Sequence, residues 1–279
     1  MLKKRLIPVL FLKNGLIVRS EGFHDFREFG NPINQLERLN DWEADELIYI
    51  DITRDGEHNL KRDDHKIRVA NNTLDVLRDI SKQCFMPLTF GGRIKTFDEA
   101  AKYIQNGADK IIVNTQAYES DRSTGIIEQI AHHFGSQCAV VGIDVKKRLR
   151  GDHEMFVEQG RKLVSNYTPV QWAKRAEEKG AGEIFLNSID RDGSASGYDL
   201  EIIEAVSSAV RIPVIACGGA GSFDDFVEVF QKTSASAVAA GNIFNFTENA
   251  YIRAKKELEI AGCPVKPCLQ NRILEEKRK

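Results

Sequence analysis

Glycine-rich segments at the ends of apolar runs could bind phosphate groups. Glycine lets backbone N–H groups approach an anion closely, and the start of a following helix adds free N–H groups and the positive end of its dipole. Two such segments hold similar positions in the two halves of the chain, which favours two phosphate sites and a long substrate phosphorylated at both ends. The alternative is that the glycines serve only tight turns. The candidate phosphate residues are Gly91, Gly92, Asn114, Thr115, Gly218, Gly219, Gly221, Gly241 and Asn242.

A single aspartate, Asp144, follows the apolar run Ala139–Ile143 and could transfer protons. A carboxyl group beside a reacting group can act as a general acid or base. An isolated aspartate at the end of a strand is more often structural, so the residue type alone does not decide its role. His132 and His133 have no cysteine or carboxylate at metal-ligand spacing, and the other four histidines fall in charged loops, so we predict no metal and no cofactor. Surface positions are expected for His24, His58, His65, His132, His133 and His153.

Eight short apolar runs indicate the strands that would position these residues. Amphipathic segments with helical spacing lie between them, such as Asp98–Ala108 and Pro169–Ala181. Buried strands that alternate with helices are typical of a parallel sheet, and eight of them in about 250 residues predict an α/β fold of the closed (β/α)8, or TIM barrel, type. A doubly wound open sheet is the alternative. The expected strands are Leu6–Leu12, Leu47–Ile52, Met86–Phe90, Lys110–Asn114, Ala139–Ile143, Glu183–Ser188, Pro213–Cys217 and Ala235–Ala240.

Internal repetition indicates that the barrel consists of two similar halves. Three pairs of segments match at nearly equal offsets, and one pair places Phe11 over Asp144. Because each half alone would leave open sheet edges, we predict a single barrel domain over residues 1–265, followed by a basic tail over residues 266–279. The matching pairs are Ala44–Gly56 with Ala181–Gly193, Phe90–Glu99 with Cys217–Asp225, and Ile7–Lys13 with Val140–Lys146.

Composition sets limits on the class of protein. The 279 residues are 42% hydrophobic and 29% charged, which is typical of a soluble globular chain. A net charge of −2 argues against a nucleic-acid partner that binds a broad basic face. No apolar run approaches the length of a membrane helix, and the short N-terminal run is broken by Pro8 and Lys13, so we expect neither a membrane association nor a secretion signal. Five cysteines without paired spacing indicate a reduced, cytoplasmic protein.

Motifs spread along roughly residues 1–265 are similar to those of one known family. They include LIPVL–KNG, ADEL–DI, PLTFGG, GADK–NT, FGSQ–VV–ID–K, GAGEI–SIDRDG–GYDLE and IPVIA–GGAG, and they resemble the cyclase subunit of imidazole glycerol phosphate synthase. The resemblance implies a two-component glutamine amidotransferase. A separate glutaminase subunit, bound as a heterodimer, releases ammonia, which crosses the barrel core to an acceptor at the C-terminal ends of the strands. The family acceptor carries two phosphates.

The resemblance also implies a pair of catalytic aspartates, of which this chain keeps one. Asp144 matches the aspartate at the end of strand five, but Phe11 stands where the family has its partner on strand one. Phenylalanine cannot carry a proton, and a general acid or base contributes about 10²–10⁴-fold to a rate, so we expect independent ring closure to be impaired. Two further substrate-binding positions, Asp51 and Asp192, match the family, and at a third Arg19 replaces the family's lysine, which keeps the charge but not the shape.

At the other end of the barrel, the family forms an ammonia gate from a ring of charges. The matching residues are Arg5, Glu46, Lys110 and Glu183, whose two cations and two anions can pair alternately. The alternative is four unrelated charges near solvent, although Glu46 and Glu183 are equivalent in the internal repeat. Asp109 matches a residue on the side that faces the glutaminase.

Three functions remain open from the sequence. Relatives within the family accompany enzymes that amidate N-acetyl sugars in surface-polysaccharide synthesis, and they share LIPVLxLKNG, PLTFGGRI and a long charged loop, here RDGEHNLKRDDHKIRVANN. The leading hypothesis is therefore an ammonia-using subunit that serves sugar amidation, with a phosphorylated small molecule or sugar as substrate and an N-acetyl sugar amidotransferase as a further partner. One alternative is an authentic imidazole glycerol phosphate synthase cyclase subunit of histidine biosynthesis. The other is a non-catalytic scaffold that activates the glutaminase.

Overall fold

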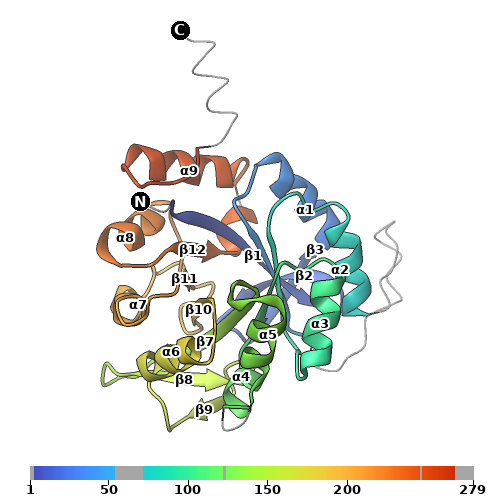
Figure 1. Cartoon of the computed structure of the whole chain (residues 1–279). Coiled ribbons are helices and arrows are strands. Elements are labelled where there is room, and N and C mark those ends of the chain that lie inside the picture. The colour runs from blue at the N-terminus through green and yellow to red at the C-terminus, as the bar shows by residue number, and fades with distance from the viewer. Residues whose placement is uncertain (1–2, 54–71, 122–123, 246, 268–279) are drawn as a thin grey trace.

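Eight parallel strands close into a barrel in the computed structural model, which describes residues 3–53, 72–121, 124–245 and 247–267. Each strand pairs with the next along the chain, and the last pairs with the first, which closes the barrel and rules out the open sheet (Figure 1). All eight expected strands are present, with ends that differ by up to four residues. They are β1 (Arg5–Lys13), β4 (Leu47–Asp51), β5 (Leu88–Gly91), β6 (Lys110–Val113), β7 (Ala139–Lys147), β10 (Glu183–Ser188), β11 (Val214–Cys217) and β12 (Ala237–Ala240).

Side chains of the strands alternate between the barrel interior and the helices outside. On β1, Leu6 and Leu10 belong to the layer between sheet and helices, whereas Ile7, Val9 and Phe11 belong to the cluster inside the barrel. Both faces of the sheet are therefore covered. This explains why the strands are continuous apolar runs instead of alternating ones.

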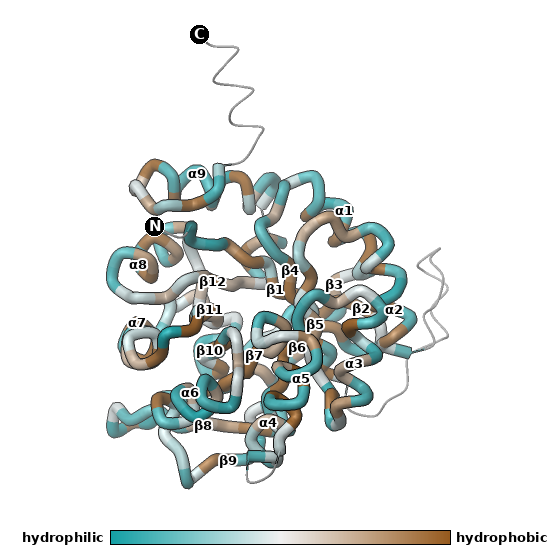
Figure 2. The backbone as a smooth tube through the Cα atoms, in the orientation of Figure 1, coloured by the Kyte–Doolittle hydropathy of each residue, from teal (hydrophilic) through white to brown (hydrophobic). Residues whose placement is uncertain are grey.

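Helices surround the barrel in a ring, with their apolar residues turned toward the strands (Figures 1 and 2). Thr96 and Thr168 begin two of them with capping boxes, each accepting a bond from a backbone N–H in the first turn. The helices are α1 (Pro32–Asp41), α2 (Thr73–Ser81), α3 (Phe97–Gln105), α4 (Thr115–Glu119), α5 (Ile126–Phe134), α6 (Pro169–Glu178), α7 (Leu200–Ser207), α8 (Asp224–Lys232) and α9 (Ala250–Ile260), with short 3₁₀ turns at Ser136–Cys138 and Asn242–Asn245.

Two antiparallel hairpins extend equivalent strands of the two halves. The first consists of β2 (Leu16–Glu21) and β3 (Asp25–Gly30) and follows β1. The second consists of β8 (His153–Val157) and β9 (Lys162–Val164) and follows β7. The sequence analysis did not predict them, because β3 is largely exposed and carries no apolar run. Their equivalent positions extend the internal repeat beyond the matching segments.

The last helix, α9, joins the two ends of the described chain through buried polar contacts. Lys255 Nζ lies 2.7 and 2.8 Å from the two carboxylate oxygens of Asp45, and its side chain is only 1% exposed. Tyr251 Oη donates to the carbonyl of Leu6 at 2.9 Å. Beyond the helix, the backbone N–H of Lys4 donates to Pro264, and Lys4 forms a parallel bridge with Val265.

No helix among the described residues is long and apolar enough to cross a membrane. The cysteines in the described part of the chain are all free thiols. The long charged loop that follows β4 and most of the basic tail lie outside the described residues.

Candidate functional site

Asp144 lies near the C-terminal end of β7 with two amide side chains held against it. Asn114 Nδ2 donates to one carboxylate oxygen at 3.0 Å, and Asn187 Nδ2 donates to the other at 3.2 Å. Asn187 sits opposite Asp144 in the register of β7 and β10. Asn187 is not apparent from the sequence alone, although an asparagine that directly follows the apolar residues of EIFLNS is a signal that points to it.

Burial raises the pKa of Asp144 to about 7, while the hydrogen bond from Asn187 and the charge of Lys146 oppose the rise. Asp192 raises the pKa further as a second negative charge. A carboxyl group with a pKa near neutrality can both donate and accept protons at physiological pH. Asp144 therefore has the properties that a general acid or base requires.

Phe11 occupies the equivalent position on β1, and its side chain packs inside the barrel. Its ring meets that of Phe23 edge to face, with centroids 5.5 Å apart. Phe23 belongs to the tip of the β2–β3 hairpin, and its ring contacts Phe26 in turn. The position on β1 that corresponds to Asp144 thus belongs to an aromatic cluster and cannot itself transfer a proton.

The mouth of the barrel contains a cavity of about 520 Å³ beside Asp144. It is enclosed by the ends of β4 to β7 and by β10, and three cations, Arg93, Lys95 and Arg161, line it together with polar groups. Glu119 and Glu158 also line it, and both pair with Lys162. Of the candidate phosphate residues, the structure brings Gly92, Asn114 and Thr115 to this cavity.

The glycines after β5 and β11 approach the neighbouring strand closely. A Cβ at Gly92 would lie 2.0 Å from the carbonyl oxygen of Asp51, and a Cβ at Gly218 would lie 2.5 Å from that of Ser188. Asp51 and Ser188 are equivalent in the internal repeat, so both halves require glycine for the same steric reason. This packing accounts for the two glycines whether or not an anion binds there.

The second group of candidate residues lines a separate cavity of about 30 Å³ between β11, β12 and β1. It is bounded by Gly218, Gly219, Gly241 and Asn242, together with Phe11 and Asp192. Gly221 is not among its lining residues; its backbone N–H donates to Asp225 at 2.8 Å. This volume has room for about two or three water molecules.

The β2–β3 hairpin forms hydrogen bonds with the polar groups around this smaller cavity. Asp192 accepts hydrogen bonds from the hydroxyl of Ser20 and from the backbone N–H of Phe23, the latter at 3.1 Å. Burial raises the pKa of Asp192, and these two bonds oppose the rise. Asn242 Nδ2 donates to the carbonyl of Ser20 at 2.9 Å. Two of the predicted substrate-binding side chains therefore hold the hairpin.

The other two predicted substrate residues are also engaged within the chain. Asp51 is 2% exposed and accepts from the backbone N–H of Thr53 at 2.8 Å and from the hydroxyl of Thr73. It fixes the end of β4 against the start of α2 and contributes to the wall of the larger cavity. Arg19 pairs with Glu21 at 2.6 Å on the hairpin.

At the opposite end of the barrel, four charged side chains form one closed ring of ion pairs. Arg5 lies 2.7 Å from Glu46 and also pairs with Glu183. Lys110 Nζ lies 3.1 Å from Glu46 and 3.0 Å from Glu183. All four side chains are at most 20% exposed. The structure thus brings together the residues that the sequence analysis grouped.

The ring balances its own charges. Burial by itself would lower the pKa of Arg5, but Glu183 and Glu46 outweigh it, and the pKa is raised. Each carboxylate accepts from both cations. Such reciprocal pairing offsets the cost of removing charges from water, and removal of one partner would leave an uncompensated charge.

Asp109, the predicted interface residue, lies just before β6 at the same end of the barrel as the ring. Its carboxylate accepts from the backbone N–H of Leu88 at 2.7 Å. Asp45 makes the equivalent bond to Leu6 at 3.0 Å. Both aspartates thus tie one strand start to the next, a structural role that does not depend on a partner subunit.

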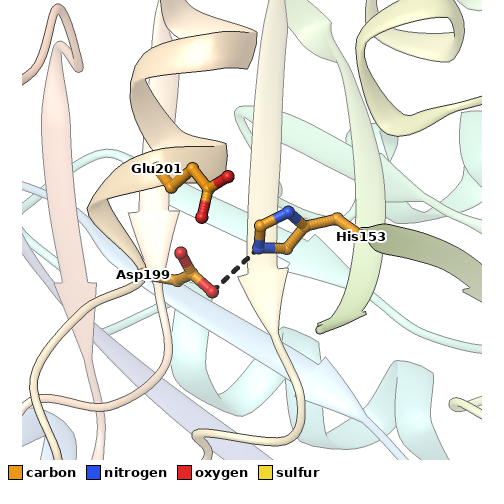
Figure 3. Close-up of side chains that lie close together, drawn as sticks. All are labelled: His153, Asp199 and Glu201. Carbon is orange, nitrogen blue, oxygen red and sulfur yellow. Dashed lines mark hydrogen bonds and ion pairs between the residues drawn. The ribbon is translucent and has the colours of Figure 1, made fainter. Parts of the chain in front are cut away.

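The expectation for His153 was wrong. It lies in β8, not in a surface loop, and its side chain is 8% exposed because it packs against the start of α7. Figure 3 shows its ring directed at Asp199, 2.9 Å away, with Glu201 beside them. These three could surround a metal ion, but Lys147 already pairs with Glu201 at 2.5 Å and Arg191 lies 3.6 Å from Asp199. The cluster acts as an ion-pair network that fastens the second hairpin to the barrel.

Comparison with known proteins adds to this geometry. The model of the histidine biosynthesis protein family matches residues 5–250. The imidazole glycerol phosphate synthase subunit HisF of Alkaliphilus metalliredigens is 40% identical over 258 residues, which cover 92% of this chain and 96% of that protein. Those of Streptococcus sanguinis and Streptococcus gordonii are each 37% identical over 266 residues, covering 95% of this chain and 100% of each relative.

Proposed function

The chain belongs to the histidine biosynthesis protein family, and from this premise we propose that it is the ammonia-using synthase subunit of a two-component glutamine amidotransferase. A glutaminase subunit, bound in a heterodimer, would supply the ammonia. The acceptor would be a phosphorylated small molecule held at the barrel mouth, and the complex would work in the cytoplasm.

The arrangement of β1 carries this proposal. Arg5 and Phe11 lie on the same inward-facing row of the strand, about 20 Å apart. The ring of charges therefore closes one end of the barrel interior, and the acceptor cavity lies at the other end. Ammonia from a glutaminase docked at the ring would travel along this axis to the cavity beside Asp144.

We consider two acceptors for this mouth. The names of the relatives favour the precursor of imidazole glycerol phosphate, with closure of an imidazole ring as the reaction. For that reaction, another group would have to replace the family aspartate, because residue 11 of this chain is Phe11.

One observation favours a different acceptor, an N-acetyl sugar of surface-polysaccharide synthesis. Phe11 is 7% exposed and packed against Phe23, so residue 11 offers no acid or base to pair with Asp144. Conversion of an acetamido to an acetamidino group uses ammonia but closes no ring. In that reading, an N-acetyl sugar amidotransferase would complete the system.

The purified chain, supplied with the bis-phosphorylated ribulosyl precursor and an ammonium salt, separates the two acceptors. Formation of imidazole glycerol phosphate at an ordinary enzymatic rate would establish the first acceptor and exclude the second. Absence of product, together with glutamine-dependent amidation of an N-acetyl sugar when the glutaminase and the sugar enzyme are added, would establish the second.

Co-expression with a glutaminase subunit tests the amidotransferase role itself. We expect one peak that contains both proteins in size-exclusion chromatography. Failure to form a complex would overturn the proposal. A complex in which glutamine is hydrolysed but no acceptor is converted would instead identify the chain as a non-catalytic activator of the glutaminase.

A further inference from the structure

We propose that Phe11 and Phe23 form a partition across the barrel mouth, which restricts the acceptor to compounds that carry their phosphate groups at one end only. The proposal rests on the proposed function in one respect, because it takes the mouth to be the acceptor site. It concerns the class of compound that fits there and does not depend on ammonia transfer.

The two cavities of the mouth share no lining residue. Phe23 lines the cavity beside Asp144, and Phe11 lines the smaller one between β11 and β12. The two rings are in edge-to-face contact and therefore separate the two cavities. A substrate that spanned the mouth would have to pass through the place that the rings occupy. A phosphate at each end would require an open path between the two cavities.

The hairpin that carries Phe23 is fixed over the smaller cavity. Gly22 donates to the carbonyl of Asp192 at 2.8 Å, and Phe23 donates to the carboxylate of the same residue. Asn242 adds a bond to Ser20 on β2. These contacts hold the hairpin tip, and with it Phe23, in place over the smaller cavity.

Phe23 also adopts a backbone conformation that bulky residues rarely tolerate. Its φ is +60°, and Gly22 before it has the same value, in a tight turn closed by a bond from His24 to Glu21. A non-glycine residue in this region is strained and persists only where its surroundings hold it there. Burial of the ring against Phe11 and the bond to Asp192 are the interactions that hold it.

The larger cavity has the groups that a singly anchored anion needs. Arg93, Lys95 and Arg161 provide positive charge in its lining, where Glu119 and Glu158 are both paired with Lys162. Asp144 with its two asparagines lies at the same cavity. A phosphorylated sugar or a sugar linked to a nucleotide could place its charged end at the cations and its reactive group toward Asp144. The partition would exclude a compound that is extended with phosphates at both ends.

Backbone amide resonances of the full chain, followed during titration with inorganic phosphate, test the partition. We expect resonances of Gly92 and Thr115 to shift and those of Gly218, Gly219 and Gly241 to stay unchanged. In the double variant Phe11→Ala/Phe23→Gly, both sets should shift, because glycine keeps the turn at residue 23 while the rings are removed. Phe26→Ala removes a neighbouring ring that lines neither cavity and should behave as the wild type.

Each other result would overturn the proposal. Shifts at Gly218, Gly219 and Gly241 in the wild type would mean that the second site is open. The absence of shifts in both sets would mean that the larger cavity holds no anion. If the double variant responded only at Gly92 and Thr115, the rings would not be what closes the second site. None of these results depends on a glutaminase, so a failed complex would leave the partition standing.

Discussion

Phe11 and Asp144 hold equivalent positions in the two halves of the barrel but offer opposite chemistry. Asp144 is buried, held by two asparagines and titrates near neutrality. Phe11 fills the same place on β1 with an aromatic ring. Residue 11 therefore cannot act with Asp144 in proton transfer, and this difference affects which reactions the mouth can support.

Restoring the missing carboxylate should restore ring closure. We expect Phe11→Asp to raise the rate of imidazole glycerol phosphate formation with ammonium salt by about 10²-fold or more over the wild type, because it supplies the second acid or base. Phe11→Leu removes the ring without adding a carboxylate and serves as the control. Equal rates in the two variants would show that proton transfer at residue 11 does not limit the reaction.

The raised pKa of Asp144 should appear in the pH dependence of stability. Between about pH 4 and pH 7 the folded chain keeps this carboxyl protonated while the unfolded chain ionises it, so the free energy of unfolding should fall as the pH rises. A shift from 3.8 to about 7 corresponds to about 4 kcal/mol. Asp144→Asn should show a smaller fall in urea unfolding at pH 4 to 8, because Asp192, whose pKa is also raised, still contributes, while the exposed Asp152→Asn should keep the full fall. Parallel curves for all three proteins would contradict the assignment.

At the scale of elements, the buried ion pair between α9 and the start of β4 is the point where loss of a single side chain should matter most. Lys255→Met leaves the carboxylate of Asp45 buried without its partner and should lower the free energy of unfolding by about 3–5 kcal/mol. Lys256→Met, at an exposed position on the same helix, should change it by less than about 0.5 kcal/mol. Denaturant midpoints of the two variants provide the test, and equal midpoints would show that the pair adds nothing to stability.

The strands were predictable and the hairpins were not, for one physical reason. Barrel strands are buried on both faces, so they appear in the sequence as apolar runs such as Glu183–Ser188. The strand β3 is exposed along most of its length, and its residues Asp25–Gly30 carry no such pattern. The positions of Phe11 and the four ring charges followed from the internal repeat and the family resemblance. The contact of Phe11 with Phe23 depends on the hairpin and could not be predicted without it.

At the scale of the whole molecule, the ring of charges should control how ammonia reaches the mouth. In a complex with the glutaminase, Lys110→Gln should raise the glutamine consumed per product formed. Glu46 and Glu183 would keep only their pairs with Arg5, so the ring that guides ammonia into the interior would no longer be closed. Activity with added ammonium salt should be unchanged, since the mouth is about 20 Å away. Lys102→Gln, exposed on α3, is the control. An unchanged ratio in Lys110→Gln would argue against a gate at this ring.

The bridge between Lys4 and Val265 places the two ends of the described chain side by side. Closure of the barrel should therefore not depend on which half is synthesised first. A circularly permuted chain, with a short linker from Pro267 to Lys3 and new termini opened after Gly135, should fold to the same barrel and give the same circular dichroism spectrum. In that chain the half with Asp144 would emerge first from the ribosome, and the half with Phe11 would complete the ring around it.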